Sequence, residues 1–357
     1  MSEILISRKK LKHNFEFLSK LFESNNMQWG IVTKLLCGLP LYIKEVIDLG
    51  AKELMDSRIS NLRVIKLLDP SVKTIYIKPP PRKSIPSVVK YADVSLNTDL
   101  ETLKMISKEA VKQKKKHQVI IMVEMGELRE GVMGDNLLSF YNKAFQLPNI
   151  EVVGLGTNLN CLYGVMPSKD KLIQLALYKQ LIELKFNKKI KLLSGGTSVT
   201  IPMIFKKQIP ASINHFRVGE TLYFGNNLVT GKTIKGMKDD VISFSAEIIE
   251  LIEKPLVPEG EMQENPSGES FDIDPANYGK TAVRAILDVG LLDISPDFLT
   301  PIDKNISIAG ASSDMLVVNL EKNPQKYKVG DSIKFKLKYM GALSLFNSNY
   351  TVKRVVD

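Results

Sequence analysis

Two short glycine-containing segments in the second half of the chain have the composition of an anion site. They read SGGTS at residues 194–198 and RVGE at residues 217–220. Glycine lets backbone N–H groups approach an anion closely, and the hydroxyl groups of Thr197 and Ser198 add further donors. Tight turns alone would also explain the glycines. The phosphate-site interpretation therefore depends on whether the two segments lie together.

A lysine in the first tenth of the chain has a position suited to covalent chemistry. Lys34 directly follows Val32 and Thr33, which end a β-rich run. A lysine at the end of a strand can form a Schiff base with an aldehyde cofactor when its surroundings lower its pKa. The chain holds 49 Lys and Arg residues, so a solvated or salt-bridged lysine is the alternative.

Eight short β-rich runs alternate with amphipathic stretches and supply the elements that would position these residues. The runs lie at residues 28–33, 53–55, 74–77, 92–96, 118–123, 152–156, 191–193 and 215–218. Such alternation is typical of βα units around a parallel sheet. Its size predicts an α/β fold with a closed (β/α)8 TIM-like barrel, and an open doubly wound sheet is the alternative.

Barrel enzymes place their sites at the carboxyl ends of the strands, where the βα loops surround one mouth. Lys34 follows the first run, Arg129 follows the fifth, and Asn158 follows the sixth. The segments at residues 194–198 and 217–220 follow the seventh and eighth, whose loops commonly bind phosphate in barrels. The pattern predicts one site that combines these residues.

A second, smaller, β-rich domain is predicted after the barrel. We expect the barrel at residues 1–231 and the C-terminal domain at residues 232–357. Alternating segments typical of antiparallel strands lie at residues 241–252, 282–289, 307–308, 315–320 and 332–339. A Pro-, Gly- and Glu-rich stretch at residues 254–279 is too long for a simple turn, and loops of that length are usually functional or disordered.

The composition favours a cytoplasmic enzyme over a nucleic-acid or membrane protein. The net charge is +10, but the densest basic run, at residues 112–116, has no interleaved aromatic residues and is typical of a solvated face. No apolar run approaches the length of a membrane span, and no N-terminal targeting segment is recognisable. The only cysteines, Cys37 and Cys161, lack metal-ligand spacing and fit a reducing compartment, so we expect no metal.

In this order, the motifs VTK, ELREG, SGGTS, RVGE and GASSD resemble those of the alanine racemase superfamily of fold-type III pyridoxal-phosphate enzymes. The resemblance spans nearly the whole chain and includes LMDSRISNLRVIK, RAILDVGLLD and YMGALSLFNSNY. It implies a racemase that interconverts L- and D-amino acids by proton exchange at Cα. The closest likeness is to the members that act on basic amino acids, so ornithine or lysine is the expected substrate, with alanine as the alternative.

The resemblance also implies a role for each strand-end residue. Lys34 would carry pyridoxal 5'-phosphate, Arg217 would face its pyridine nitrogen, and Arg129 would lie near the substrate carboxylate. Other cofactor contacts would come from Asn158, Ser194, Gly195, Gly196, Thr197, Ser198, Gly219, Glu220 and Tyr339. A guanidinium does not release its proton at ordinary pH, so the ring nitrogen would stay unprotonated, which suits racemisation and suppresses transamination. Lys34 would then exchange a proton on one face of Cα and a second base on the other.

Several positions depart from the alanine racemase pattern. Gly38 stands where the family has a tyrosine, Asn158 replaces a histidine, and Met122 aligns with a lysine that is often carbamylated. The catalytic tyrosine of the second domain aligns with Phe271, so the second base is open. Glu269 is the first candidate for it, and the others are Asp272, Tyr278 and Ser313.

The resemblance implies a head-to-tail homodimer, because Ser313 and Asp314 of GASSD fall where a partner subunit completes the substrate site. For a basic substrate, the distal ammonium needs an acidic partner. The 254–279 stretch offers candidates at Glu259, Glu261, Glu264, Glu269, Asp272 and Asp274. A non-catalytic pyridoxal-phosphate-binding protein of the same barrel fold is the alternative from another class, but such proteins lack the second domain.

Overall fold

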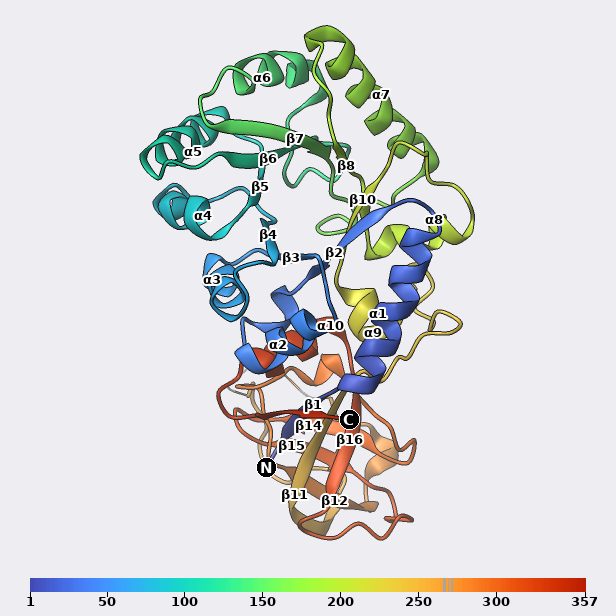
Figure 1. Cartoon of the computed structure of the whole chain (residues 1–357). Helices are drawn as coiled ribbons and strands as arrows, with labels where there is room; N and C mark the ends of the chain where they lie inside the picture. The colour runs from blue at the N-terminus through green and yellow to red at the C-terminus, as the bar shows by residue number, and fades with distance from the viewer. Residues whose placement is uncertain (266–267, 269, 271) are drawn as a thin grey trace. The chain divides into compact units, whose positions relative to one another are not determined.

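Two compact units make up the computed structural model, which describes residues 1–265, 268, 270 and 272–357. The barrel unit comprises Ser7–Val241 together with Val355–Asp357. The C-terminal unit comprises Met1–Ile6 together with Ile242–Arg354. In Figure 1 most of the barrel unit runs from blue to yellow, and the strands of the C-terminal unit are mainly orange and red.

Parallel strands form the centre of the barrel unit. They are β2 (Gln28–Val32), β3 (Glu53–Asp56), β4 (Lys73–Tyr76), β5 (Val94–Asn97), β6 (His117–Met122), β7 (Ile150–Gly156), β8 (Leu192–Ser194), β9 (Gly196–Thr197) and β10 (His215–Val218). Among the described residues they make one nine-stranded sheet in the order β8-β7-β6-β5-β4-β3-β2-β10-β9. All eight predicted runs are therefore strands of the expected sheet.

The sheet closes because β8 and β9 are two parts of one stretch of chain. Ser194 at the end of β8 pairs with Gly156 of β7. Gly196 in β9 pairs on the other side with Phe216 of β10. The stretch from β8 to β9 thus bridges the two ends of the sheet into a nearly closed barrel. This connection rules out the open doubly wound sheet.

Helices follow most strands and cover the outside of the barrel. They are α1 (Arg8–Glu23), α2 (Pro40–Asp48), α3 (Ile59–Leu68), α4 (Ile85–Tyr91), α5 (Leu100–Lys112), α6 (Leu137–Ala144), α7 (Lys169–Phe186), α8 (Ile201–Phe205) and α9 (Glu220–Phe224). Short polar side chains begin the longer ones: Asp99 accepts from the backbone N–H of Thr102 at 2.8 Å, and Ser168 from that of Lys171 at 3.2 Å. Such caps satisfy N–H groups that have no partner within the helix.

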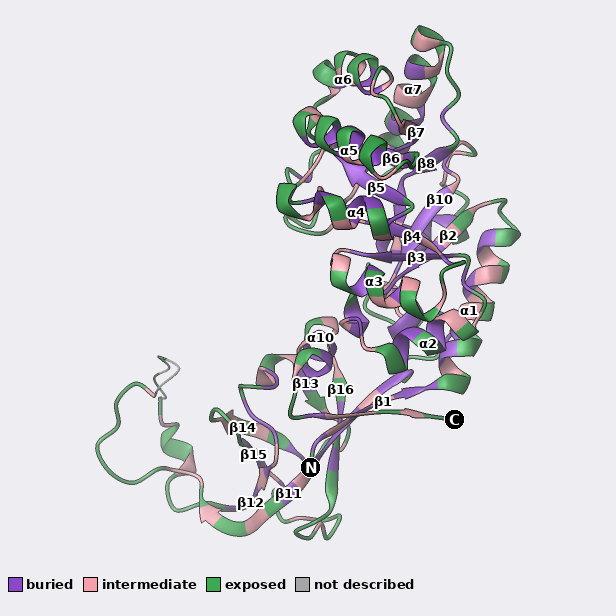
Figure 2. Cartoon of the chain, turned by 60° about the vertical axis from the view of Figure 1, so that its left-hand side comes forward, coloured by how far each residue is buried: buried purple, intermediate pink, exposed green. Residues whose placement is uncertain are grey.

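The barrel core is built from apolar side chains of the strands. A buried cluster contributed by β2 to β8 contains Val32, Met55, Ile75, Val94, Leu96, Ile120, Met122, Val153 and Leu192. Figure 2 shows the barrel strands mostly buried, with exposed residues on the outer turns of α4, α5 and α6. This burial stabilises the strands whose carboxyl ends carry the predicted site residues.

An antiparallel sheet dominates the C-terminal unit. Its strands are β1 (Glu3–Ser7), β11 (Ile242–Pro255), β12 (Thr281–Leu287), β13 (Leu299–Pro301), β14 (Ser307–Ala311), β15 (Leu316–Asn319), β16 (Ser332–Leu337) and β17 (Val352–Val356). The main order is β13-β16-β11-β12-β15-β14, and β1 pairs with β11 and β17. One helix of the described part, α10 (Tyr339–Asn347), follows β16.

The observed boundaries differ from the sequence-based ones at four points, one of which is that Val355–Asp357 belongs to the barrel unit. Residues 1–6 join the C-terminal unit because β1 pairs antiparallel with β11, Glu3 opposite Ser245. The barrel unit extends to Val241. The strand expected to reach Tyr339 ends at Leu337, and Tyr339 is the first residue of α10 instead.

Two expectations about surfaces can be compared with the described residues. No helix among them has both the length and the apolar character needed to cross a membrane. The basic run at residues 112–116 lies between the end of α5 and the start of β6, where Lys112, Lys114, Lys115 and Lys116 are all exposed. This is the solvated face that the sequence indicated.

Candidate functional site at the carboxyl ends of the barrel strands

Lys34 lies where the first barrel strand ends. It is the first residue of the 3-10 helix η1 (Lys34–Leu36) and follows the buried Thr33. The backbone N–H of Thr33 donates to the carbonyl of Met55 at 2.8 Å, and its hydroxyl donates to the Asp56 carboxylate at 2.8 Å. The turn that carries Lys34 is therefore fixed to the end of the neighbouring strand β3.

Asp56 anchors this turn and was missed by the sequence analysis. Its carboxylate is fully buried and also accepts from the backbone N–H of Arg58 at 2.8 Å and from the Asn61 amide at 3.2 Å. Burial raises its pKa, and these hydrogen bonds, with that from Thr33, act in the opposite direction. A carboxylate with several donors can hold three segments in one arrangement.

Gly38, where the family pattern has a tyrosine, is required by the same arrangement. Its φ is +72°, in the left-handed region that favours glycine. A Cβ atom at this position would lie 2.5 Å from the Asn61 side-chain oxygen. The close approach of Asn61 therefore excludes any larger side chain at residue 38 in this backbone conformation.

The two glycine-containing loops after β8 and β10 lie side by side. The Ser198 hydroxyl accepts hydrogen bonds from the backbone N–H groups of Gly219 and Thr221, each at 3.3 Å. Ser198 also begins the short helix η4 (Ser198–Thr200), for which Thr197 is the capping residue. The joint position on which the phosphate-site interpretation depended is thus present.

Packing within the barrel also requires glycine at residues 195 and 196 of the first loop. A Cβ atom at Gly196 would fall 1.9 Å from a ring carbon of Phe216, and one at Gly195 would fall 3.0 Å from the Ile213 methyl. The absence of a side chain at Gly196 lets β9 approach β10 closely, and Gly195 packs against Ile213 and against Leu172 and Leu175 of α7. These glycines therefore have a structural role in closing the barrel, whatever ligand the loop binds.

Glu220 links this loop to Lys34. It begins α9, is half-buried, and accepts a hydrogen bond from the Asn226 amide at 3.0 Å. Burial raises the pKa of its carboxyl, while Asn226 and the charge of Lys34 act to lower it. Strand β10 pairs with β2, with Val218 opposite Ile31, so the end of β2 and the loop after β10 are neighbours.

Arg217 is a buried cation inside the carboxyl end of the barrel. Only 5% of its surface is exposed. Its guanidinium donates to the carbonyl and the hydroxyl of Ser194 and, at 2.7 Å, to the carbonyl of Thr157. Burial lowers its pKa to about 10, which still leaves it protonated at neutral pH. Of the negatively charged groups nearby, Glu130 is the main one that favours its charge.

Arg129, Glu130 and Asn158 form a polar cluster beside Arg217. The Arg129 guanidinium donates two hydrogen bonds to the Glu130 carboxylate, and this contact raises the pKa of Arg129. The Asn158 amide lies 3.5 Å from the same carboxylate and 3.2 Å from the Cys161 sulfur. The predicted residues of the fifth and sixth loops are therefore together. Glu130, which holds them together, was not predicted.

Glu127 organises the loop after β7 and was also missed. Its carboxylate is 1% exposed and accepts hydrogen bonds from five backbone N–H groups. These belong to Asn160, Cys161, Leu162, Tyr163 and Val165. Burial alone raises the pKa of Glu127, but the N–H donors outweigh it and lower the pKa to about 2.

Acid should therefore loosen this loop in a defined pH range. The folded-state pKa of Glu127 lies below the ordinary value of 4.5, so its contribution to stability is complete above pH 4.5 and is lost as the pH falls toward about 2. Glu127→Gln should loosen the loop already at neutral pH, because an amide oxygen is a weaker acceptor and its NH2 faces N–H donors. Hydrogen exchange of residues 160–165 measures the change, and Glu23→Gln, at an exposed glutamate that ends α1, is the control. Unchanged protection in Glu127→Gln would contradict the role.

The remaining predicted site residues belong to the C-terminal unit. Ser313 and Asp314 are exposed between β14 and β15, and the carbonyl of Ser313 accepts from the backbone N–H of Leu292 at 2.8 Å. Tyr339 begins α10. Glu269 and Phe271 lie outside the described residues. The described acidic residues of the 254–279 stretch are exposed: Glu259, Glu261, Glu264, Asp272 and Asp274.

The described residues contain no cluster of side chains suited to bind a metal ion. No group of three or more His, Cys, Asp or Glu side chains there has an arrangement that could hold a metal ion. Cys37 and Cys161 do not form a disulfide with each other. The groups that the described strand ends bring together are a lysine, two arginines, hydroxyl groups and carboxylates.

Comparisons with known proteins agree with this arrangement. Residues 6–227 match the family described as alanine racemase, N-terminal domain. An ornithine racemase of Acetoanaerobium sticklandii is 36% identical over 99% of this chain and 99% of its own length. A lysine racemase of Thermotoga maritima is 27% identical over 98% of this chain and 97% of its own length.

A solved structure shares the fold of the whole chain. An alanine racemase from Bartonella henselae with covalently bound pyridoxal phosphate superposes with a TM-score of 0.76 at 16% identity, covering 99% of each chain. At that identity the likeness shows the fold: a parallel barrel followed by a β-rich unit.

Proposed function

Because this chain belongs to the alanine racemase family and is an amino-acid racemase dependent on pyridoxal 5'-phosphate, we propose that it interconverts the enantiomers of a basic amino acid, ornithine first and lysine second. The observation that carries the choice of a basic substrate is the 36% identity to an ornithine racemase over 99% of the chain. The racemase site itself is supported by the meeting of two glycine loops through Ser198, with Lys34 and Arg217 at the same ends of the strands. A racemase of this kind needs all of these groups around one cofactor.

The residues of the barrel mouth fit pyridoxal 5'-phosphate. The loops after β8 and β10 offer backbone N–H groups and the hydroxyl groups of Thr197 and Ser198 for a phosphate. Lys34 supplies an amine at the end of β2, and Arg217 supplies a buried guanidinium. Tyr339, from the C-terminal unit, is the proposed further phosphate contact.

When bound, the cofactor withdraws electron density from the substrate Cα. Lys34 Nζ exchanges the Cα proton on one face of the substrate. Arg217 would donate a hydrogen bond to the ring nitrogen without releasing its proton, because its pKa stays well above neutral. By keeping that nitrogen unprotonated, Arg217 would favour return of a proton to Cα over transamination. Arg129 orients the substrate carboxylate by charge-assisted hydrogen bonds.

The second base belongs to the C-terminal unit in this proposal. Glu269 remains the first candidate, and Asp272, Tyr278 and Ser313 are the others. Each would return a proton to the face of Cα opposite Lys34. A carboxylate or phenol in this role must be deprotonated near neutral pH to accept the Cα proton. Desolvation raises the pKa of both groups, but a carboxyl starts from about 4 and a phenol from about 10, so a desolvated carboxyl ionises more easily at neutral pH.

We propose that the site is completed in a head-to-tail homodimer, because the barrel and the GASSD segment lie in separate units of one chain. Mixing Lys34→Ala protein with a Ser313→Ala, Asp314→Ala double mutant should then restore activity. Random exchange makes about half of the dimers hybrid, each with one intact site, so about a quarter of the wild-type activity should return. Native mass spectrometry confirms the exchange. Hybrid formation without recovered activity would contradict the shared site, as would a fully active monomer.

The preference for a basic substrate should be large. The distal ammonium of ornithine needs a carboxylate or carbonyl partner when it leaves water, and acidic residues of the 254–279 stretch are the proposed source. Loss of one hydrogen-bonded charge costs roughly 2 to 5 kcal/mol, so kcat/KM for ornithine should exceed that for alanine by at least about thirtyfold. Chiral chromatography of ornithine, lysine, alanine and serine reactions measures this. Equal or better turnover of alanine would contradict the preference for a basic substrate and would indicate an alanine racemase.

We also propose a cytoplasmic location for the enzyme. Cys161 is outside any disulfide and is exposed beside Asn158 of the polar cluster. A free exposed thiol at a catalytic mouth is best preserved in a reducing compartment.

A further inference from the structure

A continuous series of polar groups runs through the barrel interior from Arg217 toward the amino ends of the strands. Arg217 donates to the Ser194 hydroxyl, which lies 2.7 Å from Nδ1 of His215. Nε2 of His215 lies 2.9 Å from one oxygen of Glu53, and the other oxygen accepts from Lys73 at 2.7 Å. We call these five residues the interior chain. His215 and Ser194 have no exposed surface.

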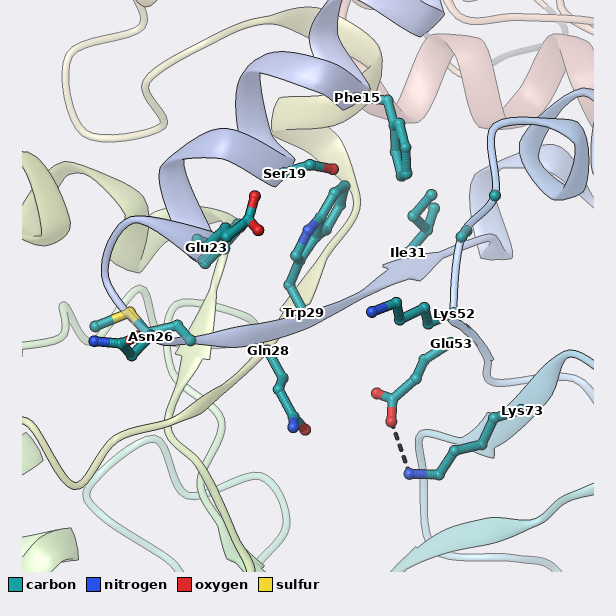
Figure 3. A pocket seen from close by; sticks show the side chains of 14 residues that line it. Phe15, Ser19, Glu23, Asn26, Gln28, Trp29, Ile31, Lys52, Glu53 and Lys73 are labelled. Carbon is teal, nitrogen blue, oxygen red and sulfur yellow. Dashed lines mark hydrogen bonds and ion pairs between the residues drawn. The ribbon is translucent and has the colours of Figure 1, made fainter.

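The outer end of the interior chain lies in the wall of a pocket at the amino ends of the strands. The pocket has a volume of about 800 Å³ and is lined by residues of α1, β2, β3 and β4. Figure 3 shows Glu53 and Lys73 joined on one side of it, with Trp29 across from them. Glu53 therefore connects a solvent-facing lysine to a histidine deep in the barrel.

With His215 neutral, one arrangement of protons satisfies every member of the interior chain. The ionised Glu53 accepts hydrogen bonds only, so Nε2 of His215 must carry a proton. Burial lowers the pKa of His215 and favours its neutral form, so Nδ1 is an acceptor and the Ser194 hydroxyl must donate to it. The Ser194 oxygen is then left to accept from Arg217. The hydrogen bonds of the interior chain therefore run in one donor-to-acceptor order.

The charges around His215 are consistent with this order. Burial alone raises the pKa of Glu53, but the hydrogen bonds from His215 and Lys73 and the charge of Lys73 lower it. Arg217 and Lys73 both disfavour a proton on the second nitrogen of His215, whereas Glu53 favours one. Glu53 is therefore ionised, and His215 stands as a neutral dipole between a carboxylate and a guanidinium.

Gly30 makes room for the interior chain to cross the barrel. It lies in β2 opposite Arg217 of β10, so it stands between the strands that carry His215 and Glu53. A Cβ atom at Gly30 would lie 2.9 Å from the Cβ of Glu53 and 3.0 Å from its carbonyl oxygen. Any larger residue would displace Glu53. The missing side chain is a structural requirement of the Glu53–His215 contact.

We propose that His215 is a positioning residue of the racemase: together with Glu53 it fixes the Ser194 hydroxyl as an acceptor, and this holds the Arg217 guanidinium toward the cofactor. This inference rests on the proposed role of Arg217 at the pyridine nitrogen. The carbonyls of Ser194 and Thr157 bind Arg217 in any case. With His215 neutral, the interior chain adds the Ser194 hydroxyl as a third acceptor for Arg217, and thereby selects one orientation of a side chain with several rotatable bonds.

The test uses the holoenzyme reconstituted with cofactor labelled with 15N in the pyridine ring. His215→Leu removes the acceptor for the Ser194 hydroxyl and should shift the ring-nitrogen resonance. It should also lower kcat about tenfold, equivalent to about 1.4 kcal/mol, with KM changed less than about twofold. His215→Gln can still donate to Glu53 and accept from Ser194, and should recover most of both properties.

His117→Leu is the matched control. His117 is the other buried histidine of the barrel strands, 1% exposed, and its ring bonds the Ser95 hydroxyl at 2.8 Å without a link to Arg217. It should lower Tm without moving the ring-nitrogen resonance or kcat. If His215→Leu does not fold, Ser194→Ala breaks the same link with a smaller change and should give the same shift.

The outcomes separate this inference from the proposed function. A wild-type ring nitrogen without a hydrogen bond from Arg217 would overturn the proposed site and this inference with it. A wild-type signal that shows this hydrogen bond, left unmoved by both His215→Leu and Ser194→Ala, would overturn the positioning role alone. A shift of equal size in His117→Leu would show a general effect of core substitutions and would also overturn it.

Discussion

Replacing Lys34 with alanine should lower kcat for racemisation by at least about a thousandfold, because one residue both binds the cofactor and exchanges the Cα proton. The backbone that carries Lys34 is held by the preceding residue, because the Thr33 hydroxyl forms hydrogen bonds with the Asp56 carboxylate and the Met55 carbonyl. The substitution itself changes only an exposed side chain. Folding should therefore be preserved, and the loss should appear in chemistry.

Two measurements separate this result from a general loss of structure. Borohydride reduction of the wild-type holoenzyme, followed by peptide mapping, should place the pyridoxyl group on Lys34. Lys52→Ala is the matched control, because Lys52 is an exposed lysine at the opposite, amino end of β3. Normal turnover by Lys34→Ala, or a label on another lysine, would remove Lys34 from the mechanism.

Arg217→Glu should lower racemisation by at least about a hundredfold and produce a new long-wavelength absorption band when substrate is added. A carboxylate at this position would favour a proton on the ring nitrogen, whereas the guanidinium keeps that nitrogen unprotonated. Absorption spectra during turnover show the band. Chiral chromatography gives the rate.

A neutral variant separates the charge effect from the loss of the guanidinium. The glutamate would face the carbonyls of Ser194 and Thr157, which now accept from Arg217, and part of the loss would come from repositioning. Arg217→Gln keeps a neutral donor, so it should lose less rate and show no new band. Normal turnover by Arg217→Glu without a band would mean that Arg217 does not contact the ring.

The barrel was predictable because its strands have a local signal. Runs such as residues 118–123 are rich in buried β-branched residues, and the polar residues that follow each run mark the loops. A parallel barrel brings the ends of all its strands to one mouth, so placing Lys34, Asn158 and the two glycine loops together needed only the strand order. Closure through β8 and β9 then followed from the size of the sheet.

Features that depend on distant partners could not be read in the same way. β1 pairs with β11, whose residues follow the whole barrel in sequence, and a five-residue run carries no sign of so distant a partner. Tyr339 was placed in a strand because the alternation of β16 continues nearly to it, while the helix α10 begins there with no side-chain cap.

The same limit applies to the carboxylates that organise the site. Asp56, Glu127 and Glu130 are ordinary acidic residues in sequence, and each gains its role from N–H or guanidinium donors that the fold brings to it. A signal existed for Glu127 and Glu130, since both lie in the ELREG motif beside Arg129. Nothing in the sequence distinguishes the five backbone donors around Glu127.

Incubation of the holoenzyme with L-ornithine in D2O tests the central claim most directly. Proton NMR follows loss of the Cα proton signal, and chiral chromatography follows the enantiomers. We expect D-ornithine to accumulate until both enantiomers are equal, with deuterium at Cα and no oxo acid formed. A protein that binds the cofactor at Lys34 yet leaves L-ornithine, lysine and alanine unchanged, with their Cα protons retained, would be a cofactor-binding protein without racemase activity and would contradict this claim.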